Sequence, residues 1–329
     1  MVIQESGFRL RTTKKFEVLI MKENGTSVLV SGGSGFVGRN VVRDLVGEGD
    51  EVTLLLRNPA RFKQQEPDIA RQCRLIKYDL SGASDPDLQV FKGVTTVIHL
   101  VGIISETREN TFEKTHVLTT KRLLSAASQC GVNRFVHMSA LGTRPNAVSE
   151  YHKTKWRAEQ LVRESNLQYT IFRPSLIYGP NDHLVSLFSK LSRFTPVLAL
   201  PPTGLAEVQP VFVHDVAHAF SQSVRLPRTA GKTYDLCGPE KMAFKEFLSR
   251  LLKISRRKRM IVEIPRSLAF LQAIAAEKSF PLFNVAPPLT RDQLIMLNED
   301  NTGDFESAVH DLGLQGTPLS EGLKRSLSE

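Results

Sequence analysis

Short apolar runs alternate with amphipathic stretches through the first half of the chain. Residues 36–46, 111–130 and 151–165 carry apolar positions at helical spacing, and Gly131 follows the second stretch as a helix stop. The intervening runs are continuously apolar, as is typical of strands buried on both faces. These predicted strands are 27–31 (SVLVS), 51–57 (EVTLLLR), 73–78, 94–101 (VTTVIHLV), 134–139 (RFVHMS) and 168–173 (QYTIFR). Repeated strand–helix units of this kind predict a parallel sheet with helices on both faces.

The pattern changes after Pro174, where further prolines break the chain into loops and short elements. Residues 233–237 (TYDLC) predict one more strand, and the stretch from Gly238 onward is rich in helical patterns. We therefore expect an α/β fold, with a Rossmann-type doubly wound parallel sheet and a smaller C-terminal lobe.

Three glycines follow the first predicted strand and open the first helix. Gly32, Gly35 and Gly38 form the spacing G-x-x-G-x-x-G in a strand–loop–helix context. Glycine lets backbone N–H groups approach a pyrophosphate closely, and the helix N-terminus adds unpaired donors and a partial positive charge. A glycine-rich turn without a ligand is the alternative, but the context favours a dinucleotide-binding loop.

Further cofactor contacts are expected beside this loop and at the ends of other predicted strands. They are Ser34, Phe36, Val37, Leu80, Leu100, Val101, Gly102 and Pro174. The expected divisions of the chain are an N-terminal extension (1–25), an NAD(P)-binding Rossmann domain (26–175) and a final part (176–329). In that final part the last Rossmann elements interleave with the small lobe.

The end of the second predicted strand bears on the choice of nicotinamide cofactor. Sites for NAD place an acid there to hold the ribose 2′-hydroxyl, whereas this chain has Arg57, followed by Arg61. A guanidinium at this place pairs with a 2′-phosphate, which favours NADP(H) over NAD(H). Asp79, just after the third strand, is a candidate acceptor for the adenine amino group. A surface arginine and a turn-capping aspartate are the alternatives.

A tyrosine and a lysine lie four residues apart on the helix predicted after the fifth strand. Tyr151 and Lys155 therefore share one helix face. The pKa of a free tyrosine is about 10, and a nearby ammonium is expected to lower it toward a value useful for acid/base chemistry. The lysine can also hold the nicotinamide ribose. A solvated helix face is the alternative for a Y-x-x-x-K spacing.

Composition and charge restrict the class of protein. The 329 residues are 41% hydrophobic and 23% charged, which is ordinary for a globular protein, and the net charge is +9. A basic cluster at Lys253 and 256–259 carries part of that excess, but no nucleic-acid-binding motif accompanies it. The three cysteines form no metal or disulfide pattern, which fits a reducing compartment. No apolar stretch reaches the length of a membrane span, and no signal peptide is recognisable.

The order of the motifs resembles that of the extended short-chain dehydrogenases/reductases. The matching segments are GGSGFVG, HMSALG, YHKTK, TIFRPSLIYGP and VFVHDVAHA. HMSALG, residues 172–180, PVFVHDVA and the tail LTRDQLIMLNEDN are similar to one atypical branch of that family. The branch contains the nucleotide-binding accessory subunit of respiratory complex I and its bacterial relatives. This resemblance implies a tightly held, structural cofactor, usually NADPH, and a protein partner in a membrane-associated respiratory complex.

The chain departs from the catalytic set of that family. The resemblance implies Asn, Ser, Tyr and Lys, but the Asn position falls at His116 and the Ser position at Ala140, one residue beyond Ser139. Tyr151 and Lys155 match. Loss of a positioned hydroxyl donor lowers a reaction rate by about a hundredfold or more. His116 and Ser139 therefore remain only doubtful catalytic candidates.

Two further patterns are weaker. His214 and His218 echo a zinc motif, but no third ligand stands out, so we expect no metal; His99 and His137 are expected in the core. Residues 265–277 predict an amphipathic helix, for which core packing is the main interpretation. A peripheral membrane contact through 253–277 is the alternative.

Two functions follow from these observations. The incomplete catalytic set favours a protein that holds NADP(H) structurally, as an assembly factor or a subunit. Tyr151 and Lys155 favour the alternative, an active NAD(P)-dependent reductase or epimerase/dehydratase acting on a small carbonyl or sugar-nucleotide substrate. An apolar pocket lined by residues 184–200 would instead suit a lipid-like or quinone-like substrate. We expect a cytoplasmic or matrix-side location, peripheral to the inner membrane and without secretion.

Overall fold

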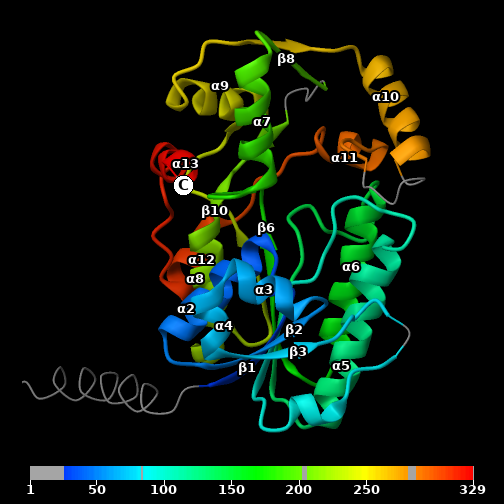
Figure 1. The fold of residues 1–329 in the computed structure, drawn as a ribbon, viewed down its shortest axis with the longest axis vertical. Helices are drawn as coiled ribbons and strands as arrows, with labels where there is room; N and C mark the ends of the chain where they lie inside the picture. The colour runs from blue at the N-terminus through cyan, green and yellow to red at the C-terminus, as the bar shows by residue number, and fades with distance from the viewer. Residues whose placement is uncertain (1–25, 83, 202–205, 281–286, 329) are drawn as a thin grey trace, which may run out of the picture.

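A seven-stranded, wholly parallel sheet forms the centre of the molecule (Figure 1). The computed structural model describes residues 26–82, 84–201, 206–280 and 287–328, so the expected extension 1–25 lies outside the described residues. The strands follow the order β11-β6-β5-β4-β1-β2-β3. They are β1 (Ser27–Ser31), β2 (Glu51–Leu56), β3 (Cys73–Lys77), β4 (Thr96–His99), β5 (Arg134–Met138), β6 (Gln168–Pro174) and β11 (Lys232–Leu236).

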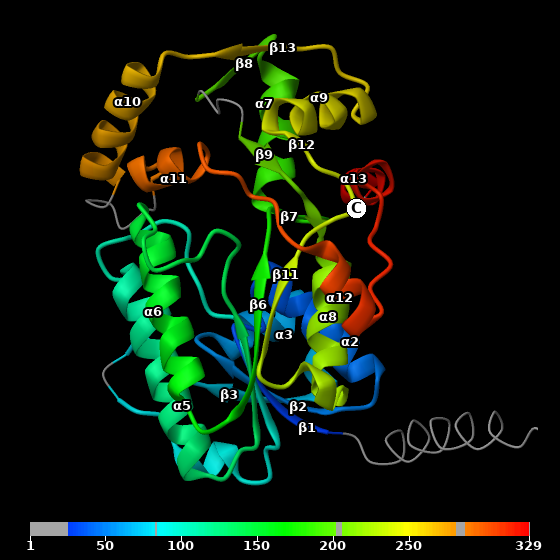
Figure 2. The ribbon, with the colours of Figure 1, turned by 180° about the vertical axis from the view of Figure 1, so that it is seen from behind.

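Helices cover both faces of this sheet, so the expected doubly wound fold is confirmed. Val28 and Val30 of β1 face one apolar core and Leu29 faces the other, as alternation along a strand requires. Figure 2 shows the two helical layers on either side of the sheet. One layer contains α2 (Phe36–Gly47), α4 (Pro67–Gln72), α8 (Val213–Arg225) and α12 (Phe305–Leu312). The other contains α5 (Thr119–Gln129) and α6 (Glu150–Glu164).

A smaller lobe lies beyond one end of the sheet (Figure 1). Its apolar core joins α7 (His183–Phe194), α9 (Phe244–Ile254) and α13 (Leu319–Ser328). Short strand pairs complete it. They are β7 (Ile177–Tyr178) with β10 (Val211–Phe212), β9 (Glu207–Val208) with β12 (Met242–Ala243), and β8 (Val197–Leu200) with β13 (Met260–Glu263). The helices α10 (Arg266–Ser279) and α11 (Arg291–Met296) pack on each other. Among the described helices, none is both long and apolar enough to cross a bilayer.

Two predicted elements differ from the structure. The strand expected at 94–101 is only Thr96–His99, because the chain leaves the sheet after the hydrogen bond from Leu100 N to Ser31 O. The single helix expected at 111–130 begins as a π-helical segment, η2 (Glu113–Leu118), before α5. A π-helical segment widens the turn, and such segments are frequent at functional sites. Between β2 and β3 a short helix, α3 (Pro59–Gln65), carries Arg61.

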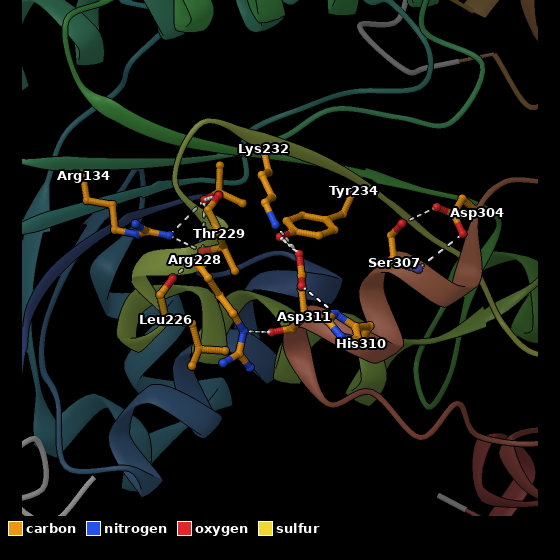
Figure 3. A network of polar contacts seen from close by, with 11 residues as sticks. Arg134, Leu226, Arg228, Thr229, Lys232, Tyr234, Asp304, Ser307, His310 and Asp311 are labelled. Carbon is orange, nitrogen blue, oxygen red and sulfur yellow. Dashed lines mark hydrogen bonds and ion pairs between the residues drawn. The ribbon is translucent and has the colours of Figure 1, made fainter. Parts of the chain in front are cut away.

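A buried carboxylate fastens α12 to the outer strand of the sheet (Figure 3). Asp311 accepts hydrogen bonds from Lys232 Nζ at 2.6 Å and from Tyr234 Oη at 2.7 Å, both on β11. His310 Nδ1 lies 2.9 Å from the second carboxylate oxygen. These hydrogen bonds, with that from Lys232 the largest contribution, hold the pKa of Asp311 well below its usual range. The main-chain carbonyl of Asp311 also accepts from Arg228 Nε at 2.7 Å.

Replacing this carboxylate should weaken the fold in a pH-dependent way. We expect Asp311→Asn to lower the free energy of unfolding by about 1–3 kcal/mol at neutral pH, since it removes charge-assisted hydrogen bonds. The folded pKa lies below the unfolded value of about 3.9, so the contribution is complete above that value and is lost as the pH falls through the folded pKa. In urea unfolding, Asp311→Asn should therefore lose the same unfolding free energy relative to the wild type at about pH 7 and about pH 5. The loss should be smaller at about pH 3.

Glu306→Gln is the matched control, because Glu306 is an exposed acid on the same helix. It should leave the unfolding free energy unchanged within about 0.5 kcal/mol. An equal loss in both variants, or a deficit of Asp311→Asn that does not depend on pH, would contradict the role assigned to Asp311.

Candidate functional site

A crevice of about 340 Å³ opens where β1, β2, β3 and β4 end. In a parallel α/β sheet, ligands bind at the carboxyl ends of the strands, near the point where the strand order reverses. Nine of the residues expected from the sequence line this crevice. They are Gly32, Ser34, Gly35, Arg57, Asp79, Leu80, Leu100, Val101 and Gly102.

The glycine loop joins β1 to α2 through a turn that needs glycine. Gly32 has a φ of +81°, and a Cβ there would lie 2.9 Å from the carbonyl carbon of Leu100 on the neighbouring strand. A Cβ on Gly38 would collide with the carbonyl oxygen of Gly32. The first turn of α2 thus packs directly on the loop backbone, and its free N–H groups point toward the crevice as an anion site requires.

The ends of β2 and β3 supply the charged residues of the crevice. Arg57 is exposed and lines the cavity, whereas Arg61, on α3, is exposed but does not. Asp79 also lines it, and its Oδ1 accepts hydrogen bonds from Ser81 N at 3.0 Å and Ser81 Oγ at 2.7 Å. The turn-capping alternative for Asp79 is therefore present in the structure, beside its position in the cavity wall.

Two hydroxyl groups in the wall have no hydrogen-bond partner among the described residues. Ser105 Oγ and Thr115 Oγ1 are buried, and both residues line the crevice. Buried polar atoms are nearly always paired, so unpaired hydroxyls beside a cavity indicate a missing polar ligand. The crevice thus fits a dinucleotide: it combines a glycine cradle, a cation and unsatisfied hydroxyls.

Lys155 lies behind Gly102, which lines the crevice, but neither Tyr151 nor Lys155 is itself a lining residue. Lys155 Nζ donates to Met138 O at 3.0 Å, and a Cβ on Gly102 would lie 3.0 Å from the same nitrogen. The ammonium is buried, which lowers its pKa to about 8, although the nearby Glu159 opposes this shift. The absence of a side chain at Gly102 therefore leaves the lysine next to the cavity wall.

The surroundings of Tyr151 are aromatic. Its ring centroid lies 5.8 Å from Phe112 and 5.3 Å from His116, in edge-on arrangements. Burial raises the pKa of the Tyr151 phenol to about 12. Our expectation that Lys155 lowers this pKa is wrong, because burial is the dominant effect and the ammonium does not offset it.

His116 occupies the position at which the family resemblance implies Asn. Thr154 Oγ1 donates to Glu150 O or Tyr151 O, each at 2.9 Å, and so accepts from His116 Nδ1 at 2.8 Å. His116 Nε2 lies 3.2 Å from Ile103 N and 3.1 Å from Ile103 O, so it pairs with the main chain of Ile103. Burial, followed by the charge of Lys155, lowers the pKa of His116 to about 2. The ring is a neutral brace between α6 and the loop after β4.

Two other histidines lie in the sheet, as expected. His99 is fully buried, and its Nδ1 lies 2.7 Å from Ser31 Oγ. Burial, with a smaller effect of Lys155, lowers its pKa to about 3. His137 is 1% exposed, and neither ring nitrogen has a hydrogen-bond partner among the described residues. Lys155 is thus the positive charge next to a group of neutral histidines.

The position implied for a catalytic serine carries no hydroxyl. Ala140 is buried there. Ser139 is also buried, and its Oγ lies 3.4 Å from Thr143 Oγ1, away from the lining of the crevice.

The C-terminal segment reaches the start of the tyrosine helix. Asp292 of α11 accepts from Glu150 N at 2.7 Å and from Tyr151 N at 2.9 Å, so it caps α6 from 141 residues away in sequence. Arg144 and Glu299 form a bidentate pair, with both N–O distances 2.9 Å. The segment around α11 is therefore fixed to the first turn of α6, the helix that carries Tyr151.

The remaining predicted residues lie outside the lining of the crevice. Val37 and Gly38 are buried on α2, Phe36 packs against the core of that face, and Pro174 is buried at the end of β6. Sequence reasoning missed several lining residues. They are Leu55, Leu56, Tyr78, Ser81, Ile103, Ser105, Thr107, Asn110, Thr115 and Thr119. Most of them follow β3 and β4 directly, and the rule that ligands lie at carboxyl ends of strands was the available signal.

His214 and His218 lie on α8 without a metal-like arrangement. Within the described ranges, no three His, Cys, Asp or Glu side chains group as metal ligands. Asp215 between them binds Thr317, with its carboxylate accepting from Thr317 N at 2.7 Å and Oγ1 at 2.9 Å. In this way Asp215 anchors the segment that leads to α13.

Two mitochondrial respiratory subunits are similar in sequence to most of this chain. The mitochondrial NADH dehydrogenase [ubiquinone] 1 alpha subcomplex subunit 9 of Arabidopsis thaliana is 29% identical over 300 residues, covering 89% of this chain and 73% of the relative. The mitochondrial NADH-ubiquinone oxidoreductase 40 kDa subunit of Neurospora crassa is 27% identical over 300 residues, covering 90% and 77%. These relatives confirm the resemblance to the complex I branch.

The fold has close counterparts among solved structures. The UDP-glucuronic acid 4-epimerase of Bacillus cereus, in complex with UDP-glucuronic acid and NAD, superposes with a TM-score of 0.70 at 19% identity. The match covers 92% of this chain and 98% of that one, and it shows the fold alone. The sequence profile of the NAD dependent epimerase/dehydratase family matches residues 28–237, nearly the whole of the sheet with its glycine loop and its Tyr151–Lys155 helix. The chain therefore belongs to the NAD-dependent epimerase/dehydratase family, whose extended short-chain dehydrogenase/reductase fold it has.

Proposed function

We propose that this protein holds NADP(H) in the crevice as a structural component and does not turn it over. Its role is then similar to that of the mitochondrial respiratory subunits it resembles, as a subunit or an assembly factor of a membrane-associated complex. Such a protein works on the cytoplasmic or matrix side of the inner membrane.

The residues of the crevice suit each part of this cofactor. The N–H groups of the glycine loop and of the first turn of α2 would hold the pyrophosphate. Arg57 would pair with the 2′-phosphate, and Ser105 and Thr115 would donate their unpaired hydroxyl hydrogens. Lys155, which is in contact with Gly102, would hold the nicotinamide ribose. When bound, the cofactor supplies a hydride donor or acceptor.

The environment of Tyr151 carries the structural part of the proposal. A general acid or base works best when its pKa lies near the ambient pH, and the Tyr151 phenol, at about 12, is far from it. No serine hydroxyl stands at Ala140, and Asp292 holds α11 over the first turn of α6. This chain can therefore position a cofactor, but it lacks the polarising donor that a carbonyl substrate needs.

The second candidate is an active reductase or epimerase/dehydratase. It is favoured by Lys155, whose pKa of about 8 and position beside Gly102 suit a proton relay between solvent and a cofactor ribose. In that case Tyr151 would transfer the proton to a small carbonyl or sugar-nucleotide substrate, and cofactor binding would have to lower its pKa.

Tyr151→Phe separates the two functions. On the structural proposal, the variant keeps stoichiometric nucleotide after dialysis, as measured by mass spectrometry of the denatured protein, and melts at the wild-type temperature. Gly38→Ala is the contrasting variant, because its Cβ collides with Gly32. It should lose the nucleotide and, with it, about 3 kcal/mol of stabilisation at ligand concentrations a hundredfold above Kd.

NADPH oxidation against a panel of carbonyls and quinones completes this test. Wild-type turnover that Tyr151→Phe abolishes would establish the enzyme and reject the structural role. Protein that carries no nucleotide and is not stabilised by NAD(H) or NADP(H) would reject both candidates.

Arg57→Ala tests the preference for NADP(H). Loss of a charge-assisted contact to the 2′-phosphate should weaken NADPH binding by roughly 10–100-fold and leave NADH binding unchanged. Titration calorimetry with each nucleotide measures both. Arg61→Ala is the matched control, since this arginine is exposed nearby but does not line the crevice. Equal losses for NADPH and NADH in Arg57→Ala would remove the basis for the preference.

A further inference from the structure

Exposed apolar side chains gather on the small lobe. Most of the large apolar residues that are exposed in the described part of the chain lie between residues 187 and 280. Phe194, the last residue of α7, is 84% exposed, and Met260 at the start of β13 is 66% exposed. Figures 1 and 2 show β8 and β13 at the end of the lobe that is farthest from β1.

Strand β8 is apolar on both faces, and the outer face of the β8–β13 ribbon is apolar on both strands. Leu198 and Leu200 point into the lobe, where they are 2% exposed. On the other face Val197 pairs with Met260 and Ala199 with Val262, and all four are exposed. A strand with one solvated face normally alternates apolar with polar residues, so an apolar outer face indicates a surface that is covered in function.

Positive charge surrounds this ribbon. Six lysines and arginines and no acid lie between Glu246 and Glu263. Lys253, Arg256 and Lys258 are exposed, and none of them takes part in an ion pair among the described residues. Lys253 and Lys258 border a hollow of about 520 Å³ that Met260 and Pro196 also line. On α7, Lys190 and Arg193 are exposed beside Phe194.

The turn after α9 holds one of these cations in an unfavourable conformation. Arg256 has a φ of +53°, in the left-handed region that glycine adopts most easily. Arg256 N bonds to Lys253 O at 3.1 Å and Arg257 N to Leu252 O at 2.9 Å, which closes the end of the helix. An arginine at a position suited to glycine is costly for the fold, and this indicates a use for its charge.

We propose that this surface, formed by Phe194, Val197, Met260 and Val262 with Lys253, Arg256 and Lys258, docks on a bilayer of anionic phospholipids. The apolar side chains enter the boundary between headgroups and acyl chains, and the cations lie at the level of the phosphates. The inference goes beyond the proposed function and stands whether or not the cofactor is turned over.

Charge and shape favour a bilayer over other occupants. A second copy of the chain would bring the same unpaired cations face to face, which is destabilising. A nucleic acid would use the cations but leave the aliphatic ribbon face in water. The sequence pattern pointed to residues 253–277, yet on α10 Ala269 and Ala273 are turned inward, packed near Leu294. The proposed surface is the ribbon with the end of α7, where the unpaired cations lie, although Leu268 and Leu271 of α10 are also exposed.

Vesicle cosedimentation of the full chain, as purified, tests the proposal. We expect binding to vesicles in which a third of the lipid is phosphatidylglycerol, little binding to pure phosphatidylcholine, and release at high salt. Arg256→Gly should weaken binding about fivefold, as loss of one interfacial cation does, without destabilising the fold, because glycine suits this φ. Phe194→Ser should also weaken binding, and its 84% exposure in the free protein means that the fold tolerates it.

Two matched controls each remove one side chain of the same kind, a cation or an exposed apolar side chain, away from the proposed surface. Lys121→Gln removes an exposed cation on α5, and Leu88→Ser removes an apolar side chain that is 41% exposed beside the sheet. Both should bind vesicles as the wild type does. The proposal is overturned if the wild type does not bind anionic vesicles, if all four variants bind equally, or if Phe194→Ser instead dissociates a dimer seen by light scattering.

Discussion

The need to bury both faces of a parallel sheet organises this molecule. Seven strands with apolar residues on each side would be unstable if either face were exposed to water, so helical layers cover both faces. Parallel strands also place their carboxyl ends along one edge, and that edge is where the crevice, the glycine loop and the Tyr151 helix meet. The small lobe lies beyond the same edge, and Asp292 of α11 caps the helix that carries Tyr151.

The sequence predicted those features of the fold that depend on neighbouring residues in the chain. Alternating strand and helix patterns located the strands that carry the site, and the spacing of Gly32, Gly35 and Gly38 located the loop. Contacts between distant segments were not predictable from pattern. Asp292 reaches Tyr151 N across 141 positions, and no periodicity in the tail indicates such a cap. The pKa of Tyr151 was mispredicted for the same reason, since the burial that raises it comes from Phe112 and other elements, whereas the spacing to Lys155 reports only a shared helix face.

The crevice and the Tyr151 region differ in character, although they adjoin at Gly102. In the crevice, two hydroxyls and the Arg57 guanidinium have no partner among the described residues, and steric contacts require glycine in the loop. In the Tyr151 region, His116 is neutral and its ring nitrogens are hydrogen-bonded to Thr154 and Ile103. Ala140 offers no donor. On the proposed function, the part of the site that binds the cofactor is kept, and the part around Tyr151 serves packing.

The attachment of α12 to β11 has a consequence for synthesis of the chain. The outer strand is closed by Asp311, and one face of the sheet takes Ala308 and Leu312 of α12 into its core. A ribosome delivers these residues only after all seven strands of the sheet have been made. Until α12 has been made, the earlier strands have one apolar face that is incompletely covered. During this period the nascent chain needs a chaperone or a bound ligand to avoid aggregation.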